Sequence, residues 1–481
     1  MPAAAERRPR ALFQKIWDDH VIADMGDDYS LLHVDRHVVH DMGGRSFAGL
    51  KNRGLPLKNP ELTFATADHA IPTTPGIVWS DYSNPYLENL RESSKALGFK
   101  FFAPGQPGAG VVHVVAPEQG IALPGATLAC GDSHTCTVGA LGVMGWGVGQ
   151  SELLHILATQ ASIQKRAGNM LVEIDGHIGG AITAKDVILH IIRQTGASGA
   201  RGLAVEFAGP AIRSMPMEGR FTICNMATEM GARYGLIAPD EVTFAYLKGR
   251  PYAPAGDLWE SAVAVWRHLA GDADAVFEKK VQFSIDDIAP QISWGTSPDQ
   301  VIGINEDIPD PASEPDAVRR KAMIDALEYT GLAAGKPLAG TSVDHVFIGS
   351  CTNARISDLR LAAAVAKGRR VAGHVEAWVV PGSFTVKEQA EKEGLDRIFI
   401  EAGFQWRNPG CSMCGGMGDL SREKIPSGKR AVSTTNRNFV GRQGPGSRTH
   451  LASPAMAAAA AIAGHIADVR EFRIEDHGTI A

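Results

Sequence analysis

The sequence has few cysteines for its length, and this scarcity excludes a fold stapled by disulfides. Six cysteines are spread over 481 residues, whereas small secreted domains carry them densely. No secretory apolar segment precedes them, because Asp18 and Asp19 interrupt the apolar residues near the amino terminus. We therefore expect reduced thiols and a cytoplasmic protein.

The sequence also lacks a membrane-spanning run, a nucleotide fingerprint and an excess of one charge. The longest apolar stretch, residues 453–469, is mostly alanine and contains His465, so it is too weakly hydrophobic to span a bilayer. The glycines of residues 142–152 miss the G-x-G-x-x-G spacing and are instead expected to permit close packing. With a net charge of −6 and mixed signs, we expect no membrane and no nucleic-acid partner.

Short apolar runs alternate with helical patterns along the chain, which predicts an α/β fold with mostly parallel sheets. For example, the run 345–350 is followed by a helical pattern over 356–368. Near the amino terminus, the spacing of apolar residues predicts an amphipathic helix. Its apolar face would comprise Leu12, Phe13, Ile16 and Trp17.

Two boundaries divide this pattern into three predicted lobes. Near residue 168, a helical pattern over 151–169 gives way to a new strand, turn and helix. The second boundary is the Pro- and Asp-rich stretch 306–316, which can neither pair in a sheet nor bury well. We therefore expect α/β lobes over residues 1–168, 169–305 and 306–481.

Three polar clusters each follow an apparent strand. Asp68-His69 follows "LTFATA", Asp132-Ser133-His134 follows "ATLACG", and Cys351 follows "HVFIGS". In open α/β sheets, ligands bind beyond the carboxyl ends of the strands. We therefore expect these clusters to face one cleft.

Cys411 and Cys414 form a C-x-x-C pair in a glycine-rich segment. A structural zinc ion would need a second such pair nearby, and the sequence has none. Cys351 is the best third thiolate, and three cysteines can hold a cubane iron-sulfur cluster with one iron left open. If Cys136 were a fourth ligand, the cluster would be closed and suited to electron transfer.

The acid-histidine pairs have an ordinary interpretation and a chemical one. Asp132 and Ser133 could simply cap a helix, and Asp68-His69 could be a turn before Pro72. An aspartate beside a histidine can also fix the imidazole tautomer and raise its basicity, as proton transfer to a leaving hydroxyl requires.

Two further groups are candidates for binding anions and substrate. Asn225 and Glu229 are spaced i and i+4, so a helix would place them on one face, where an exposed polar stripe is the ordinary alternative. Asn436, Arg437 and Arg442 lie in a glycine-rich segment, where arginines can clamp carboxylates or simply be solvated.

Together these stretches resemble the aconitase superfamily, and within it the large subunits of isopropylmalate dehydratases (isopropylmalate isomerases). The resemblance extends over almost the whole chain. It is carried by "TADH", "CGDSHT", "SMPMEGRFTICNMATEMGA", "FIGSCTNARISDLR", "NPGCSMC" and "STTNRNFVGRQG". It implies three α/β/α lobes with mostly parallel sheets around a central cleft, without the swivelling fourth domain of single-chain aconitases.

The resemblance also implies a cofactor and its chemistry. Cys351, Cys411 and Cys414 would hold one 4Fe-4S cluster whose open fourth iron acts as a Lewis acid on the substrate. Asp68 and His69 would protonate the departing hydroxyl. The remaining implied residues orient water or hold the substrate, and they are Asp132, Ser133, His134, Asn225, Glu229, Asn436, Arg437 and Arg442.

The implied reaction is that of a hydro-lyase in leucine biosynthesis. It would interconvert 2-isopropylmalate and 3-isopropylmalate by dehydration and rehydration through 2-isopropylmaleate. Only 67 residues follow Cys414, so the general base is expected from a small subunit that carries the swivelling domain. The substrate would be a small hydroxy-diacid.

Two departures from the family pattern keep other substrates open. Val138 stands where large subunits commonly have histidine, and Arg45 stands where they commonly have glutamine. If Arg45 faces the cleft, it adds a positive charge beside the substrate. Citramalate, dimethylmalate or a homocitrate-type acid is then an alternative substrate, and an iron-sulfur redox or iron-sensing protein is the alternative from another class.

Overall fold

The computed structural model describes residues 9–415 and 423–472, and its first lobe is built on a parallel sheet. The strand order is β5-β4-β3-β6-β7, and every pair in it is parallel. These strands are β3 (Arg36–Val39), β4 (Thr63–Thr66), β5 (Lys100–Phe102), β6 (Thr127–Cys130) and β7 (Met144–Gly147). The helices of this lobe are α1 (Leu12–His20), α2 (Gly44–Asn52), α3 (Pro85–Leu97), α4 (Val112–Glu118), α5 (Gln150–Thr159) and the 3-10 helices η1 (Asp41–Gly43), η2 (Pro60–Leu62) and η3 (Ser133–Leu141).

Local sequence explains most of these elements. All residues of β4 and β6 are buried, as expected for parallel strands covered on both faces. The amphipathic helix predicted near the amino terminus is confirmed as α1, which buries the four predicted apolar side chains. The helical prediction over 151–169 is wrong in its second half. Gln160 adopts a left-handed backbone with φ 53°, which ends α5, and β8 (Ala161–Lys165) follows.

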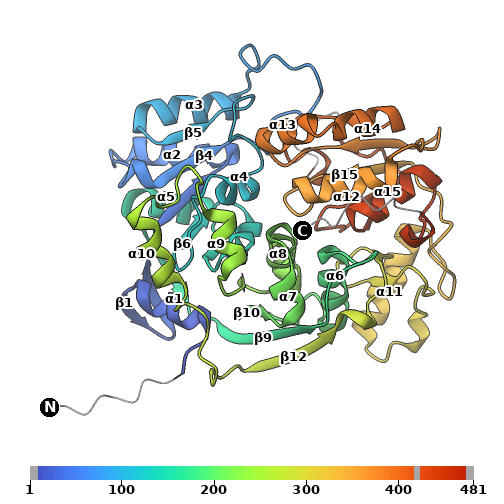
Figure 1. Cartoon of the computed structure of the whole chain (residues 1–481), viewed down its shortest axis with the longest axis horizontal. Coiled ribbons are helices and arrows are strands. Elements are labelled where there is room, and N and C mark those ends of the chain that lie inside the picture. Colours follow the sequence, from blue (N-terminus) through green and yellow to red (C-terminus); the bar gives the residue numbers. More distant parts are fainter. Residues whose placement is uncertain (1–8, 416–422, 473–481) are drawn as a thin grey trace.

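β8 belongs to a small antiparallel sheet outside the parallel one. Its order is β1-β2-β8, with β1 spanning Val21–Gly26 and β2 spanning Tyr29–His33. This sheet and α1 lie beside the amino-terminal end of the chain in Figure 1.

The second lobe contains a four-stranded parallel sheet of order β11-β10-β9-β12, at the bottom of Figure 1. Its strands are β9 (Gly168–Asp175), β10 (Leu203–Ala208), β11 (Tyr234–Leu236) and β12 (Lys279–Ser284). Its helices are α6 (Ala184–Thr195), α7 (Pro210–Ser214), α8 (Met217–Asn225), α9 (Glu241–Leu247), α10 (Asp257–Trp266), and the 3-10 helices η4 (Met226–Met230) and η5 (Ile285–Asp287).

The third lobe contains a second five-stranded parallel sheet, of order β17-β16-β15-β18-β19. Its strands are β15 (His345–Ile348), β16 (Glu376–Val379), β17 (Gln405–Trp406), β18 (Arg430–Ser433) and β19 (Arg448–Leu451). Its helices are α11 (Ala317–Thr330), α12 (Ile356–Ala366), α13 (Phe384–Lys392), α14 (Leu395–Ala402), α15 (Pro454–Ala463), and the 3-10 helices η6 (Pro311–Ser313), η7 (Ser412–Cys414) and η8 (Val469–Glu471).

The described strands thus confirm an α/β fold with several parallel sheets. The hairpin of β13 (Gln291–Ser293) and β14 (Val301–Gly303) precedes the predicted boundary at 306, yet Ile292 and Ile302 pack in the apolar core of the third lobe. The core of the first lobe is continuous with that of the second, because Trp146 and Tyr234 belong to one buried cluster. The lobe boundaries themselves stay a prediction.

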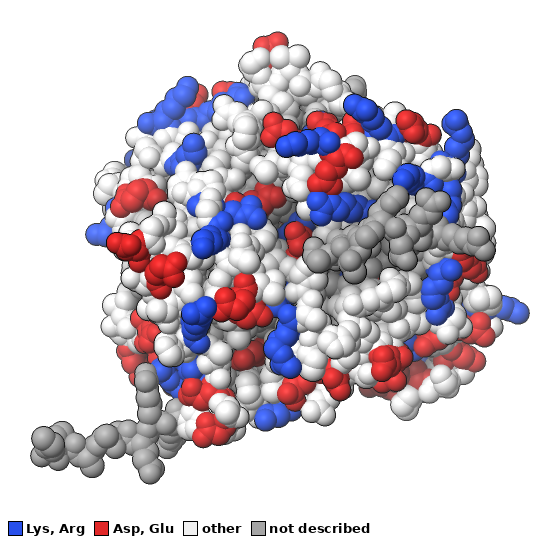
Figure 2. Space-filling view, viewed as in Figure 1, with Lys and Arg blue, Asp and Glu red and all other residues white. Residues whose placement is uncertain are grey.

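The surface agrees with the mixed charge of the sequence. On the face shown in Figure 2, basic and acidic side chains are interspersed. Among the described residues, no helix is long and apolar enough to cross a membrane, and α15 is instead a buried helix of the third lobe.

Candidate active site

Three neighbouring strands of the first lobe end at one place. β4, β3 and β6 are adjacent and parallel, so the residues after their carboxyl ends meet at one edge of the sheet. This edge brings together Asp68-His69 after β4 and Asp132-Ser133-His134 after β6, as the sequence predicts. It also adds His40 and Asp41 after β3, which sequence analysis did not single out.

Asp68 and His69 form a tight pair. The Asp68 Oδ1 atom lies 2.5 Å from His69 Nδ1, and Asp68 Oδ2 accepts a hydrogen bond of 2.8 Å from the backbone N–H of Val112. Asp68 is fully buried, while the His69 side chain keeps 21% of its surface exposed. Although burial alone would lower the pKa of His69, the Asp68 carboxylate outweighs burial and raises that pKa well above its usual range.

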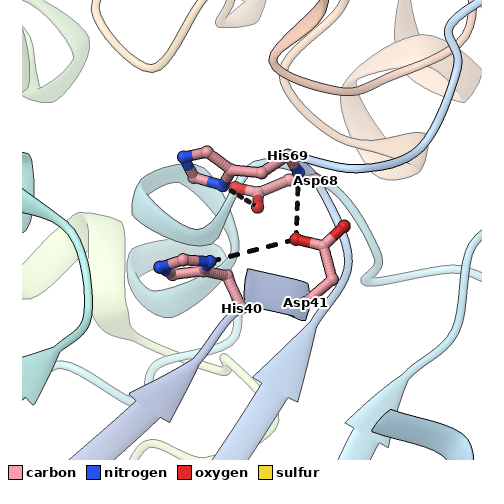
Figure 3. A group of neighbouring side chains, drawn as sticks. All are labelled: His40, Asp41, Asp68 and His69. Carbon is pink, nitrogen blue, oxygen red and sulfur yellow. Dashed lines mark hydrogen bonds and ion pairs between the residues drawn. The ribbon is translucent and has the colours of Figure 1, made fainter. Parts of the chain in front are cut away.

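His40 and Asp41 support this pair from below, as Figure 3 shows. Asp41 accepts hydrogen bonds from the backbone N–H groups of His69 at 3.1 Å and Ala70 at 2.7 Å. The His40 and His69 rings lie 4.4 Å apart between centroids. These side chains form a compact set of potential metal ligands. Every oxygen of Asp41 and Asp68 already accepts a hydrogen bond. We therefore interpret these carboxylates as groups that orient His69 and not as metal ligands.

Asp132 connects His69 to two further histidines. Its Oδ2 lies 3.3 Å from His69 Nε2, and its Oδ1 lies 2.7 Å from His113 Nε2. Oδ1 also accepts from the backbone N–H of His134 at 2.7 Å, so Asp132 caps η3 as well. Although burial alone would raise the pKa of Asp132, His113 and the other histidines hold it well below its usual range.

Glu229 continues the network toward the second and third lobes. Glu229 Oε1 lies 3.0 Å from His134 Nε2 and accepts a hydrogen bond of 2.8 Å from Arg437 Nε. Burial alone would raise the pKa of Glu229, but His134 and Arg437 lower it. The polar chain therefore runs from Asp68 to Arg437 without interruption and draws on all three lobes.

Asn225 reaches the cysteine of the third lobe. It ends α8, and its Nδ2 donates to Cys351 Sγ at 3.2 Å and to Thr137 Oγ1 at 2.8 Å. Asn436 Nδ2 donates to the same sulfur at 3.3 Å. Asn225 and Glu229 are both buried, so the exposed polar stripe considered for them is wrong.

The C-x-x-C segment is tied to the loop that follows β4. The backbone N–H of Cys411 donates to the carbonyl of Asp68 at 2.8 Å, and the hydroxyls of Ser412 and Thr73 lie 3.0 Å apart. Arg442 Nη2 lies 3.9 Å from Cys414 Sγ. The first two contacts bring Cys411 to the acid-base residues of the first lobe, and Arg442 faces Cys414 from the third lobe.

Backbone strain accompanies two of the cysteines. Ser350, before Cys351, has φ 76°, and Ser412, after Cys411, has φ 49°. Non-glycine residues rarely adopt this left-handed conformation, which concentrates at functional sites. Each cysteine is therefore positioned by a neighbouring serine whose backbone conformation is unfavourable.

The three cysteine sulfurs are spaced too widely for a single zinc ion. A zinc ion at about 2.3 Å from each sulfur needs sulfurs within about 4 Å of one another. Among the described residues, these three sulfurs do not form a set within 4.8 Å. Burial and the neighbouring Cys414 raise the pKa of Cys351 to about 12, so metal binding must displace its proton.

The site also contains three buried polar atoms that are unusual. Glu229 Oε2, Asn436 Oδ1 and Arg442 Nε are buried and make no hydrogen bond within the described residues. Such atoms are rare in folded proteins unless a ligand or water satisfies them. Of these, the atoms of Asn436 and Arg442 lie on side chains that contact a cysteine sulfur, so a polar ligand bound there could be their partner.

The remaining predicted residues lie apart from this arrangement or at its edge. Ser133 Oγ lies 3.5 Å from His134 Nδ1, and Ser133 lines a surface cavity of about 310 Å³ together with Asp132. Arg45, near the start of α2, is exposed and makes no hydrogen bond or ion pair in the part of the chain that the structure describes. Among the described side chains, Cys136 does not form a set of potential metal ligands with the three predicted cysteines, and its Sγ contacts the hydroxyl of Thr228 at 3.1 Å.

Val138, the second departure from the family pattern, is a core residue. It is fully buried, and a Cβ added at Gly145 would lie 2.4 Å from its Cγ2 atom. The glycines of β7 therefore let this strand approach η3 closely, as predicted. Val138 does not reach the polar network.

Comparisons with known proteins identify the family of the chain. Residues 14–464 match the model of the Aconitase family (aconitate hydratase). The chain belongs to the aconitase family. It is also 57% identical over 467 residues to the 3-isopropylmalate dehydratase large subunit 1 of Bradyrhizobium diazoefficiens, covering 97% of each chain. The holo form of aconitase X from Thermococcus kodakaraensis aligns at 10% identity over 89% of each chain with a TM-score of 0.44, and family membership rests on the first two comparisons.

Within this aconitase-family chain, sequence analysis missed several site residues. His113 follows the glycines before α4 in an otherwise apolar stretch, and no acidic residue beside it signals its pairing with Asp132. His40 and Asp41 are adjacent after a short apolar run, the same signal that identified Asp68 and His69, and could have been found by it.

Proposed function

We propose that this chain is the large subunit of a 3-isopropylmalate dehydratase, a hydro-lyase of leucine biosynthesis. It interconverts 2-isopropylmalate and 3-isopropylmalate by dehydration to 2-isopropylmaleate and rehydration at the neighbouring carbon. The observation that carries the proposal is the polar network from Asp68 to Arg437 beside three cysteines. The 57% identity to a large subunit of this name over nearly the whole chain supports the substrate.

The chemistry divides between a cofactor and the chain. Cys351, Cys411 and Cys414 would hold one 4Fe-4S cluster, which would supply a Lewis acid for the substrate hydroxyl. His69 holds a proton at Nε2 for the departing hydroxyl, because Asp68 fixes its Nδ1 atom and Asp132 faces its Nε2 atom. His113 keeps Asp132 in place by its hydrogen bond of 2.7 Å.

Other residues bind water and the substrate. His134 and Glu229 orient the water that is removed and added, with Ser133 and Asn225 at the edges of this group. Arg437 and Arg442 hold substrate carboxylates, because guanidinium groups pair with them bidentately. Asn436 Nδ2 already donates to Cys351 Sγ and Asn225 Oδ1, so its Oδ1, which has no partner among the described residues, offers the substrate an acceptor. The arginines stabilise the charge that develops as the carbon acid loses its proton.

The general base comes from another chain. A small subunit with the swivelling domain would close over the site and complete it. The name of the Bradyrhizobium relative, a large subunit, supports such a partner. The large subunit alone, with its cluster reconstituted, is therefore expected to show no turnover.

The two departures from the family pattern have different weight for the substrate. Val138 lies in the core, so it gives no reason to reject isopropylmalate. Arg45 is exposed near the edge where the strands of the first lobe end, and it would favour an acid with one more negative charge only if the closed complex brought it to the substrate.

One experiment tests the function and the substrate together. The chain is co-expressed anaerobically with a small subunit and assayed with 2-isopropylmalate, citramalate, dimethylmalate and homocitrate. The highest kcat/KM is expected for 2-isopropylmalate. A preference for another acid would refute the leucine-biosynthesis assignment, and iron binding without any turnover would favour the redox or sensing alternative.

A further inference from the structure

Lys185 is a lysine with no exposed surface that lies behind the site. It belongs to α6 of the second lobe and is 0% exposed. Its Nζ atom donates to the carbonyls of Thr434 at 2.8 Å and Thr435 at 2.7 Å, and to Asn353 Oδ1 at 3.4 Å. An ammonium has three donors, so these three third-lobe acceptors satisfy it.

The charge of Lys185 has no carboxylate partner at contact distance. No ion pair among the described residues includes Lys185, and its neighbour Asp186 accepts instead from Thr183 and from the backbone of Gln291. Asp358, the next acid, accepts from Asn353 and Arg355. Burial lowers the pKa of Lys185 to about 8, which Glu229 and Cys351 partly oppose. A buried charge without a partner is costly, so its presence requires an explanation.

The acceptors of Lys185 flank the cysteine site on both sides. Thr434 and Thr435 directly precede Asn436, whose amide donates to Cys351 Sγ at 3.3 Å. Asn353 follows Cys351 by two residues. One ammonium thus holds both the segment that binds Cys351 and the segment that contains it.

We propose that Lys185 is a positioning residue that fixes the hydrogen bond from Asn436 to Cys351. Its charge also balances the negative charge of the group that the three cysteines would hold. The inference rests on the proposed cluster ligation. Three thiolates make the group negative, and each added electron makes it more so. A buried cation stabilises the reduced form more than the oxidised form, because attraction grows with the charge in a medium of low dielectric constant.

The test compares variants of the reconstituted large subunit by the reduction potential of its cluster, measured by EPR-monitored titration. Lys185→Gln keeps an N–H donor but removes the charge, and it is expected to shift the reduction equilibrium at least tenfold toward the oxidised form, about 59 mV lower for one electron. Lys185→Arg restores the charge and is expected to recover most of the potential.

Lys15→Gln is the matched control. Lys15 also donates to two backbone carbonyls, those of His268 and Ala270, and it lies in α1, away from the cysteines. Unlike Lys185 it has a carboxylate partner, Asp272, at 2.7 Å. Its substitution is expected to leave the potential unchanged.

An unchanged potential in Lys185→Gln with native iron content would overturn the inference. If Lys185→Gln does not fold, Lys185→Arg provides the test. A potential in Lys185→Arg that differs from the native one would also overturn the inference. The potential needs no substrate, so the outcome is independent of the dehydratase assignment. A Lys185-dependent potential, combined with no turnover of isopropylmalate by the complex with the small subunit, would refute the function alone.

Discussion

Replacing Asp68 by asparagine tests the acid-base assignment most sharply. Asp68 is fully buried, and its two oxygens accept from His69 at 2.5 Å and from the backbone of Val112 at 2.8 Å. Asparagine keeps the shape and can still accept from Val112 with its carbonyl. Its amide N–H would then face His69 Nδ1. Because a doubly protonated imidazole also carries a proton at Nδ1, two donors would meet and the protonated form would be disfavoured.

The expected loss follows from the hydrogen bond removed. A hydrogen bond to a charged group contributes about 1.5–3 kcal/mol, which corresponds to about a 10- to 150-fold loss of rate if it acts only in the transition state. The upper end of this loss reaches the lower end of the range of about 10²–10⁴-fold that a general acid contributes. We therefore expect kcat to fall about 100-fold.

The assay is the steady-state conversion of 2-isopropylmalate by the complex with its small subunit. Asp35→Asn is the matched control, because Asp35 pairs with His20 at 2.7 Å in the same lobe but away from the cysteines. Asp35→Asn should leave kcat within twofold of the parent. A parental kcat in Asp68→Asn, at unchanged iron content, would refute the role assigned to the Asp68-His69 pair.

Three further predictions concern stability and the cluster. Burial opposes the charge of Asp35 but His20 outweighs it, so the pKa of Asp35 falls to about 2. The lowered pKa of Asp35 contributes about 2 kcal/mol of stability that is present above pH 4 and lost as pH falls toward 2. The free energy of unfolding of Asp35→Asn, measured between pH 2 and 6, should therefore depend less on pH than that of the parent. Gly145→Ala would place a Cβ 2.4 Å from Val138 and 2.6 Å from the carbonyl of Thr135, and this overpacking should destabilise the chain by about 1–3 kcal/mol. Gly149→Ala is the control, because its Cβ would meet no atom within 4 Å. Equal thermal midpoints of the two variants would contradict the close-packing interpretation. Cys136→Ala should keep the parental iron content because Cys136 contacts Thr228 rather than the other cysteines, and loss of iron would favour a closed cluster.

The strand ends were the predictable part of the site. Asp68 and Asp132 each follow a short apolar run, and parallel strands of one sheet bring such positions to one edge, so their convergence follows from the pattern. Cys351 also follows such a run, but its strand belongs to another sheet, so its approach depends on how the lobes pack. Asn225 and Glu229 were found as a pair, but their burial was not, because spacing along a helix does not tell which side the rest of the molecule covers.

Other features depend on contacts that no local pattern records. His113 stands alone in the sequence and gains its partner Asp132 only through tertiary packing. Lys185 follows an ordinary helix start, and nothing nearby shows that the third lobe will bury it. The strand β8 was assigned to a helix because a single left-handed residue, Gln160, decides where α5 ends.

The most direct test of the account is the activity of the complex when one proposed cluster ligand is removed. The chain and Cys351→Ala are each reconstituted anaerobically with the small subunit, and conversion of 2-isopropylmalate to 3-isopropylmalate is measured together with bound iron. We predict steady conversion by the parent, and loss of both bound iron and turnover in Cys351→Ala. Undiminished turnover in Cys351→Ala would contradict the account.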